Sequence, residues 1–361
     1  MDANERDVMD GEEKSLYHLF KSSKRREART IRRMQDRGGR ITNDPKEIEH
    51  IFVTYLTDKY GSVDVADNCI TEMVNVIRSH TQPSCVAYLE QSIRAEELYT
   101  AIMSGGPNKS PRSDGIGREF FLHLWDTIRD DMLQVLNHMN LNKSTTRRQQ
   151  HGIIFTLPKN NGDFTPAGYR SISLMNTDYK LLARIMARRL TSVLEEHLTS
   201  GQYCSVPGRS ILEAVSVIRD VVAHAELTRT HVCVLSLDFR NAFDRVSHHY
   251  LFTILAGYGL SEWFIDRVHS IFEQATSSVQ INGRLAGPIP IRCAVRQGCP
   301  LSMALHALCV HPLLRTLEER LTGITIGTRG QKILVLAYAD DITIFITRRE
   351  EIEIVNTAIR I

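Results

Sequence analysis

The sequence lacks the features that mark secreted, membrane-spanning or disulfide-stapled proteins. Seven cysteines are scattered over 361 residues, and no two stand in a CxxC pair, which argues against a disulfide framework or a structural zinc site. The N-terminal stretch MDANERDVMDGEEK has no apolar centre, so it is no secretory signal. No run approaches the roughly 18 apolar residues of a transmembrane helix. We therefore expect no membrane contact and a location in the nucleus or cytoplasm.

An excess of one charge is also missing from the chain as a whole. The 44 basic and 42 acidic side chains give a formal net charge of +2, so net charge neither favours nor excludes a nucleic-acid partner. The chain is 42% hydrophobic and can bury a core in one large domain or in two or three ordinary ones. It shows no internal repeat and no low-complexity tract.

One short region nevertheless concentrates basic residues. The stretch EEKSLYHLFKSSKRREARTIRRMQDRGGR, over 12–40, predicts a helix that ends at Gly38-Gly39, and its second half is rich in Lys and Arg. Such a region is either a solvated helix or disordered arm, or a patch that contacts phosphates.

Elsewhere the hydrophobic pattern separates helices from strands. Early segments have helical spacing, as in the one that opens with a capping Asp44 and with Pro45 at the first helical position. After about residue 223 strands alternate with helices, and Asn282-Gly283 is the favoured pair for a type I′ hairpin turn. This order predicts an α+β fold, with an antiparallel sheet and helices on one face. We expect strands over 152–159, 230–239, 332–338 and 342–347, and helices over 248–260, 262–274 and 300–321.

Two adjacent aspartates interrupt an apolar run near the end of the sequence. In AYADDITIF the pair Ala339-Asp340 falls where two strands reverse direction, so a tight hairpin would present Asp340 and Asp341 at its tip. Asp also suits plain turns, but two like charges side by side repel unless a proton or a cation lies between them. Divalent cations with oxygen ligands fit this position, and Mg²⁺ is the first choice.

A third carboxylate, Asp238, ends the apolar strand of CVLSLDFRNAFDRVSH. If this strand neighbours the hairpin, three carboxylates meet at one edge of the sheet. They could then hold two metal ions about 3.5–4 Å apart, the arrangement that serves in-line phosphoryl displacement. Asp244 follows in the same segment, and we expect it to cap the next helix rather than to bind metal.

The segment VRQGCPLS places Gln297 and Gly298 just before a predicted helix that starts at Pro300. Glycine permits a close backbone approach, and proline suits the first helical turn. The segment is either an ordinary loop-to-helix junction or a surface that touches a nucleotide sugar or a template base.

These segments, in this order, resemble the reverse transcriptases of non-LTR (LINE-type) retrotransposons, from about residue 45 to the end. NKSPRSDGIGREFF (108–121) is similar to the motif upstream of the fingers, residues 153–190 to the fingers, and GQYCSVPGRSI (201–211) to the next fingers motif. LDFRNAFDRVSHHYLF, INGRLAGPIPIRCAVRQGCPLS and AYADDI resemble the first-aspartate, glutamine-glycine and double-aspartate motifs. The chain departs from the usual pattern at Arg112, Ser113, Gly117 and Ser171, which bears on loop rigidity and not on the carboxylates.

The resemblance implies roles for individual side chains in the reaction. Asp238, Asp340 and Asp341 would be the catalytic triad and would hold two Mg²⁺ ions, with Mn²⁺ as the alternative. Lys159 and Arg170 would contact the triphosphate, although from position alone they are solvated surface cations. Phe243 would exclude a ribose 2′-OH, although from position alone it is a core residue. Gln297 and Gly298 would contact the nucleotide and the template.

The resemblance also implies partners and a division of the chain. An RNA template, a DNA primer and deoxynucleoside triphosphates are expected, and no obligate protein partner is evident. Arg209 and the basic region, notably Arg25, Arg29 and Arg33, would bind nucleic acid, with a strong dependence on salt. We expect an acidic and then basic helical extension over 1–45, a helical extension over 46–150, fingers over 151–222, and an incomplete palm without a thumb over 223–361.

The implied function is an RNA-directed DNA polymerase that extends a primer 3′-OH. The alternative is a non-catalytic RNA-binding remnant of a decayed or truncated element, because a primer end held without a thumb should dissociate quickly. A two-metal nuclease shares the carboxylates but does not explain Phe243 or the glutamine-glycine motif.

Overall fold

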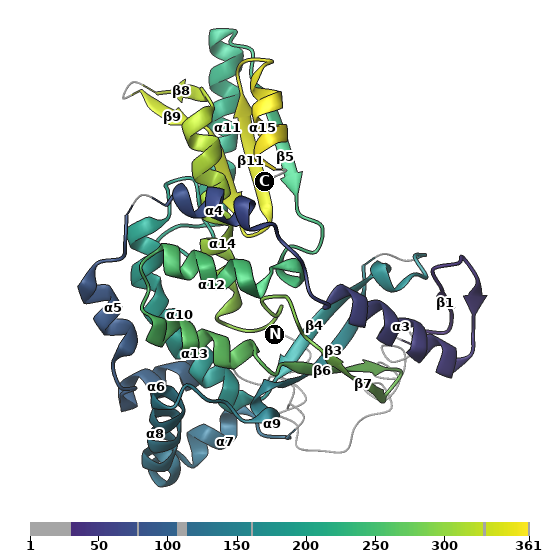
Figure 1. Ribbon diagram of the computed structural model, residues 1–361. Helices are drawn as coiled ribbons and strands as arrows, with labels where there is room; N and C mark the ends of the chain where they lie inside the picture. Colours follow the sequence, from purple (N-terminus) through teal and green to yellow (C-terminus); the bar gives the residue numbers. More distant parts are fainter. Residues whose placement is uncertain (1–29, 78, 107–113, 160–161, 328–329, 360–361) are drawn as a thin grey trace, which may run out of the picture.

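A computed structural model describes residues 30–77, 79–106, 114–159, 162–327 and 330–359 (Figure 1). Helices and short sheets alternate along the chain, which confirms the α+β class. Within these ranges no helix is both long and apolar enough to cross a bilayer.

The strands are β1 (Met34–Gln35), β2 (Ile41–Thr42), β3 (His151–Pro158), β4 (Tyr169–Met175), β5 (Cys233–Asp238), β6 (Thr276–Ile281), β7 (Arg284–Pro290), β8 (Ile324–Ile326), β9 (Gln331–Ile333), β10 (Val335–Tyr338) and β11 (Asp341–Ile346). The helices are α3 (Pro45–Lys59), α4 (Asp67–Asn75), α5 (Pro83–Glu90), α6 (Ala95–Met103), α7 (Arg118–His123), α8 (Trp125–Leu141), α9 (Arg147–Gln150), α10 (Thr177–His197), α11 (Ile211–Thr228), α12 (His248–Gly257), α13 (Glu262–Phe272), α14 (Ser302–Arg320) and α15 (Glu351–Ala358), with short 3₁₀ turns η1 (Pro166–Gly168) and η2 (Phe243–Arg245).

The three-stranded sheet, in the order β10-β11-β5, carries the aspartates. Ile342 and Ile344 of β11 belong to a core with α14 and α15, whereas Phe345 belongs to a second core with α11. Helices therefore cover both faces of this sheet rather than one, as its surroundings in Figure 1 show. The second layer is needed because β10 and β11 are apolar at nearly every position, so both faces must be buried.

The four-stranded sheet has the order β4-β3-β6-β7 and contains the predicted hairpin. Asn282 (φ 49°) and Gly283 (φ 86°) have the two positive φ angles of a type I′ turn, as expected. The hairpin joins this sheet and not the aspartate sheet, because β6 pairs in parallel with β3. Helix α3 covers one face, where Phe52 and Leu56 pack with Val279. The expected capping of α3 by Asp44 is confirmed, since its Oδ1 accepts bonds from two backbone N–H groups.

The helix predicted over 12–40 is wrong in the part that the structure describes, from Thr30 onward. Strands β1 and β2 form a short antiparallel pair there, and Gly39 (φ 84°) lies in the turn between them. Ile31 enters the core of the four-stranded sheet. The Asn282 side chain accepts from Ile31 N at 2.8 Å and donates to Ile31 O at 2.9 Å. This distant contact outweighs local helix propensity.

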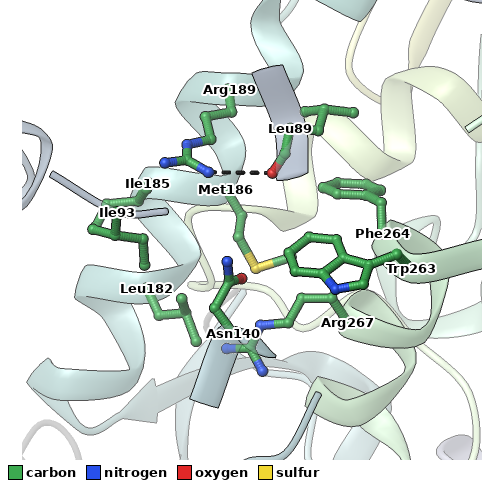
Figure 2. Close-up of a pocket in the computed structure, with 10 residues that line it drawn as sticks. All are labelled: Leu89, Ile93, Asn140, Leu182, Ile185, Met186, Arg189, Trp263, Phe264 and Arg267. Carbon is green, nitrogen blue, oxygen red and sulfur yellow. Dashed lines mark hydrogen bonds between the residues drawn. The ribbon is translucent and has the colours of Figure 1, made fainter. Parts of the chain in front are cut away.

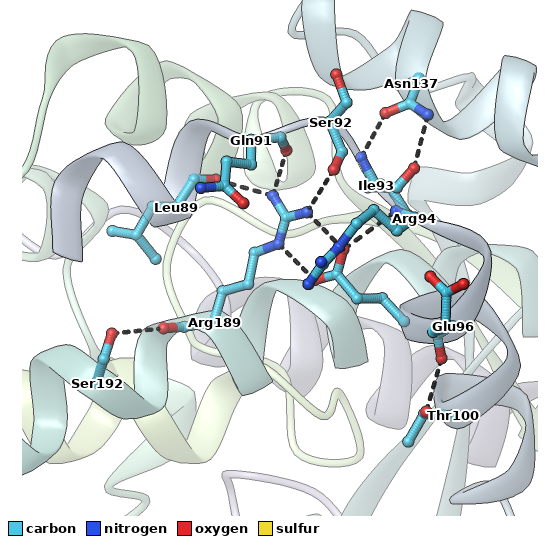
Figure 3. A network of polar contacts seen from close by, with 11 residues as sticks. Leu89, Gln91, Ser92, Ile93, Arg94, Glu96, Thr100, Asn137, Arg189 and Ser192 are labelled. Carbon is cyan, nitrogen blue, oxygen red and sulfur yellow. Dashed lines mark hydrogen bonds and ion pairs between the residues drawn. The ribbon is translucent and has the colours of Figure 1, made fainter. Parts of the chain in front are cut away.

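Helix α10 is fastened to the N-terminal helices through Arg189. Arg189 is 3% exposed, and its guanidinium donates to both carboxylate oxygens of Glu97 at 2.9 Å. It also donates to the backbone carbonyl oxygens of Leu89, Gln91 and Ser92 (Figure 3). Burial alone would raise the pKa of Glu97, but the bonds from Arg189 hold it below its ordinary value. All three nitrogen atoms of the Arg189 guanidinium therefore donate hydrogen bonds.

A second buried arginine, Arg267, lies in a very different environment. It lines a cavity of about 10 Å³ between α5, α8, α10 and α13, together with Asn140 and Arg189 (Figure 2). Arg267 is 0% exposed, and its Nη1 makes long bonds to Ser144 O (3.4 Å) and Ser270 Oγ (3.3 Å). Its Nε and Nη2 find no acceptor among the described residues. Burial lowers the pKa of Arg267 to about 10, so the group stays charged at neutral pH, and the cavity has room for about one water molecule beside it.

Candidate active site

The two aspartate segments meet at one edge of the three-stranded sheet. Strands β5 and β11 run antiparallel, and their register places Asp238 directly opposite Asp341. Strands β10 and β11 are joined by a turn of two residues, Ala339 and Asp340, in which Ala339 has a φ of 56°. The predicted tight hairpin beside the Asp238 strand is therefore confirmed. In Figure 1 the end of β5 points toward the middle of the molecule.

The carboxylates are close enough to influence one another electrostatically. Burial, and then the charges of Asp340 and Asp238, raise the pKa of Asp341. Asp238 and Asp341 are exposed and Asp340 is half-buried, so solvent reaches all three. Mutually repelling carboxylates with hard oxygen donors fit a divalent cation. Across the described ranges no three His, Cys, Asp or Glu side chains are grouped closely enough to enclose an ion, so these side chains would have to turn toward one.

Residues 201–204 flank the aspartate hairpin on the side of β10. Tyr203 N donates to Ala337 O at 2.8 Å, and Ala337 N donates to Gly201 O at 2.7 Å. Gln202 and Ala337 thus form a parallel bridge that extends the sheet by one short segment. Burial raises the pKa of the Cys204 thiol, which lies beside the turn and keeps its proton at neutral pH. The segment predicted to be a fingers motif is therefore attached to the aspartate hairpin.

Arg209 follows this segment and is half-buried. Its Nη1 donates to the backbone carbonyl oxygens of Thr199 and Gln202. These bonds close the loop that holds residues 201–204 against β10, so Arg209 has a structural role. A contact from Arg209 to nucleic acid stays a prediction.

Phe243 lies on η2, the short turn that follows β5, and is half-buried. Its backbone carbonyl accepts a hydrogen bond from Val295 N at 2.9 Å. Sequence position alone suggests a core residue, and Phe243 does pack against the helical core with one part of its ring. Its remaining surface is open to solvent, on the turn that directly follows the Asp238 strand.

Asp244 is a structural residue, but not the helix cap that we expected. Ser247 caps α12 instead. The Asp244 carboxylate is 7% exposed, pairs with Lys59 Nζ at 2.8 Å and accepts from Tyr60 Oη at 3.2 Å. Lys59 also donates to Ser171 Oγ of β4 at 3.4 Å. One buried lysine therefore joins α3, the Phe243 turn and β4.

Gln297 and Gly298 contact the four-stranded sheet through the backbone. Gln297 O accepts from Ser173 N at 3.0 Å. Gly298 has a φ of 108°, and a Cβ at this position would lie 2.5 Å from Ser173 O, so the approach requires glycine. Both residues are exposed. Residues 294–298, which we call the linking segment, thus connect the Phe243 turn with β4.

Arg170 lies on β4 of the same sheet, and Lys159 directly follows the end of β3 at Pro158. Leu157 pairs with Arg170, and Lys159 N donates to Gly168 O at 2.8 Å. Because side chains alternate along paired strands, Lys159 and Arg170 project from the same face. Both are exposed, so one face of the sheet presents two cations.

The basic region is only partly described. Arg25 and Arg29 lie outside the described residues. Arg33 is exposed, and its guanidinium lies over the Phe164 ring, 4.1 Å from the centroid. This contact places Arg33 beside the β3–β4 loop, which begins at Lys159 and leads into the strand that carries Arg170.

Sequence reasoning missed two residues of this region, Lys59 and His306. His306 of α14 stacks on Phe243, with ring centroids 4.3 Å apart and an interplanar angle of 19°. Burial lowers the pKa of His306 to about 4, although the negative charge of Asp340 acts to raise it. A single His in an apolar helix is no signal of such a contact, because only the tertiary structure brings the two rings together.

Comparisons with known proteins point to one family. A family model described as "Reverse transcriptase (RNA-dependent DNA polymerase)" matches residues 157–360. The transposon TX1 uncharacterized 149 kDa protein of Xenopus laevis is 37% identical over 254 residues, 70% of this chain and 19% of that protein. A Pol polyprotein from a type-1 retrotransposable element R2 of Popillia japonica is 30% identical over 253 residues, 69% of this chain and 34% of the relative. A probable RNA-directed DNA polymerase from transposon BS of Drosophila melanogaster is 22% identical over 340 residues, 91% of this chain and 36% of the relative. The chain thus matches between 19% and 36% of the length of these relatives.

Proposed function

This chain belongs to the reverse transcriptase (RNA-dependent DNA polymerase) family, and we propose that it adds deoxynucleotides to the 3′-OH of a DNA primer on an RNA template. The resemblance to the enzymes of non-LTR retrotransposons is confirmed by the family match and by the transposon relatives. The observation that carries the proposed reaction is the pairing of Asp238 with Asp341, next to Asp340 in the hairpin turn. It presents three carboxylates on one edge of a sheet.

Members of the family generally use divalent metal ions, and we infer that this chain takes two Mg²⁺ ions, with Mn²⁺ as the alternative. Asp238, Asp340 and Asp341 would hold them, and the ions would lower the pKa of the primer hydroxyl and neutralise the leaving pyrophosphate. The raised pKa of Asp341 supports this proposal, because burial and then the charges of Asp340 and Asp238 raise it, and bound positive charge would offset that repulsion.

The nucleotide would lie between the aspartates and the four-stranded sheet. Lys159 and Arg170 would bind the triphosphate, which is supported by their exposure on one face. Phe243 would lie beneath the sugar and exclude a 2′-OH. Gln297 and Gly298 would contact the base pair, since both are exposed where the linking segment crosses β4.

Nucleic acid would bind along the basic side of the four-stranded sheet. We propose phosphate contacts from Arg209 and from the basic region, where Arg33 lies beside the β3–β4 loop; Arg25 and Arg29 would extend that region. In this assignment β3 and β4 belong to the fingers (151–222), and β5, β10 and β11 belong to the palm (223–361), as does the β6–β7 hairpin, which pairs with β3. A helical extension precedes them.

Primer extension tests the proposal. The purified chain is given an RNA template, an annealed DNA primer, deoxynucleotides and Mg²⁺, and the elongated primer is resolved on a gel. The parent should extend the primer, and Asp340→Asn should not. Asp130→Asn is the matched control, because Asp130 is exposed on α8 and, among the described residues, forms an ion pair only with its neighbour Arg129, at 2.9 Å.

Each outcome has a distinct meaning. Extension by the parent and by Asp130→Asn, with none by Asp340→Asn, supports the polymerase. Extension by Asp340→Asn at the parental rate would refute the assignment of the aspartates. A folded parent that retains RNA without extending the primer would instead support the alternative of a non-catalytic RNA-binding remnant.

A further inference from the structure

Phe243 occupies a position that gives its ring little intrinsic rigidity. It belongs to a 3₁₀ turn of three residues, preceded by Asn241 at φ 60°. The hydrogen bond from Val295 N fixes its carbonyl but not its side chain. Aromatic side chains rotate about χ1 and χ2, so another group must fix the plane of the ring if that plane is to discriminate between substrates.

His306 is the group that the structure places against this ring. It lies in α14, a helix packed in the core, and is 3% exposed. Its neighbours along the helix, Leu305 and Ala307, are buried as well, so His306 is anchored on a rigid element. The two rings lie nearly parallel, with centroids 4.3 Å apart and 19° between their planes. Such a contact restrains the tilt of the Phe243 ring, which is half-buried.

We propose that His306 is a positioning residue: it holds the Phe243 ring flat and thereby sets the discrimination between deoxyribonucleotides and ribonucleotides. The inference rests on the proposed function and deepens it. Without the stacked partner the Phe243 ring could tilt away from the sugar and make room for a 2′-OH. Incorporation of ribonucleotides should then rise, while incorporation of deoxynucleotides, which carry no 2′-OH, changes much less.

The structure offers a matched control on the same helix. His311 is 4% exposed and stacks on Tyr258, with centroids 6.1 Å apart and 25° between planes. Its Nδ1 is bonded to Tyr258 Oη at 2.6 Å, and Tyr258 lies in the core of the helical layer. His306→Leu and His311→Leu therefore each remove a buried imidazole and a ring stack from α14, but only the first removes the support of Phe243.

The test is single-nucleotide incorporation, with kcat/KM measured for a deoxynucleotide and for the matching ribonucleotide opposite one template base. In His306→Leu the deoxy-to-ribo ratio should fall by about 2- to 12-fold, the factor that corresponds to the loss of one aromatic pair. His306→Phe restores a flat ring and should keep the parental ratio. His311→Leu should keep the ratio even if its melting temperature falls.

The failures of the two proposals are distinguishable. If Phe243→Ala lowers the ratio and His306→Leu does not, His306 has no positioning role and the inference is overturned. It is also overturned if His306→Phe behaves like His306→Leu, because the stack is then not the cause. If the folded parent incorporates no nucleotide at all, the proposed function fails and this inference fails with it.

Discussion

Asp238 faces Asp341 directly across the β5–β11 pair, so two carboxylates occupy partner positions of an antiparallel ladder. Like charges opposite each other destabilise a sheet. The pKa of Asp341 is raised in the folded protein, so the folded state binds this proton more tightly than the unfolded chain does. The metal-free protein should therefore gain stability from this group as the pH falls through the raised pKa.

The change Asp238→Asn should separate repulsion from metal binding. Without metal at neutral pH, Asp238→Asn should melt at a higher temperature than the parent, because one of the repelling charges is gone. Saturating Mg²⁺ should raise the melting temperature of the parent more than that of the variant, because ligand binding stabilises the folded state. Equal Mg²⁺ shifts in both proteins would contradict a metal role for Asp238. Lowering the pH toward 4 should shrink the difference between the metal-free proteins.

The two buried arginines beside one cavity should respond oppositely to removal. Arg189→Met would remove two hydrogen bonds to the Glu97 carboxylate, which keeps the bond from Arg94 N, and would leave three backbone carbonyl oxygens without this donor. Breaking a buried pair in this way costs about 3–5 kcal/mol. Arg267→Met removes a charge that has no carboxylate partner among the groups described, and it adds apolar surface to the cavity.

We therefore expect Arg189→Met to lower the free energy of unfolding by about 3–5 kcal/mol. Arg267→Met should leave it unchanged or raise it by about 1 kcal/mol, since well-packed apolar replacements of buried charges are often neutral or stabilising. Urea unfolding followed by circular dichroism measures both. Equal losses in the two variants would show that Arg267 has an acceptor in solution, such as a water molecule in the cavity.

Substitutions at Gly298 and Gly283 allow the strain of alanine at a positive φ to be separated from the steric clash of a Cβ with Ser173 O. Both have a positive φ, at 108° and 86°, so alanine is strained by about 1 kcal/mol at either position. A Cβ at Gly298 would lie 2.5 Å from Ser173 O, whereas at Gly283 it meets no described atom within 4 Å. Gly298→Ala should therefore cost about 1–3 kcal/mol more than Gly283→Ala, and it alone should reduce primer extension. Equal losses of stability and activity would refute the close approach of the linking segment to β4.

Glu351 should make the stability of the C-terminal part depend on pH. It is 3% exposed and accepts bonds from the backbone N–H groups of Thr322, Thr347 and Arg348. Burial opposes ionisation, but these bonds hold its pKa below the ordinary value. A depressed folded-state pKa gives stability that is present above the unfolded pKa and is lost as the pH falls through the folded one. Glu351→Gln should thus lose about 2 kcal/mol at pH 7.

The pH series provides the internal check on Glu351. The difference between the parent and Glu351→Gln should shrink as the pH falls below the unfolded pKa of about 4.3 and through the lower folded pKa. Glu353→Gln, two residues further along α15 and exposed, should match the parent at every pH. A difference in stability between the parent and Glu351→Gln that stays constant with pH would mean that the shape of the Glu351 side chain, and not its charge, stabilises the protein.

Local chemistry made much of the fold and the site predictable. Asp44 caps α3 through its own side chain, and Asn282-Gly283 forms its turn within four residues of chain. The Asp340-Asp341 hairpin is equally local, since β10 and β11 are consecutive in sequence. In each case the residues that determine the structure are sequence neighbours.

Contacts between distant segments were not predictable from one sequence. Lys59 and Asp244 lie far apart in the sequence and form a buried ion pair, and nothing in the sequence around either residue predicts the other as its partner. The β6–β7 hairpin could have extended either sheet, because its apolar pattern is satisfied by any buried face; only its parallel pairing with β3 decides the matter. His306 likewise has the pattern of an ordinary core residue until α14 is packed against the Phe243 turn.

The linking segment, residues 294–298, has a consequence for how this protein tolerates mutation. Its bonds from Val295 N to Phe243 O and from Ser173 N to Gln297 O use main-chain atoms alone. Side-chain changes at the exposed Gln297 therefore leave the connection between the Phe243 turn and β4 intact, whereas proline at 295 or 173 would delete a donor. Sequence drift can change the exposed side chains of this segment long before it disturbs the placement of the aspartate edge relative to the four-stranded sheet.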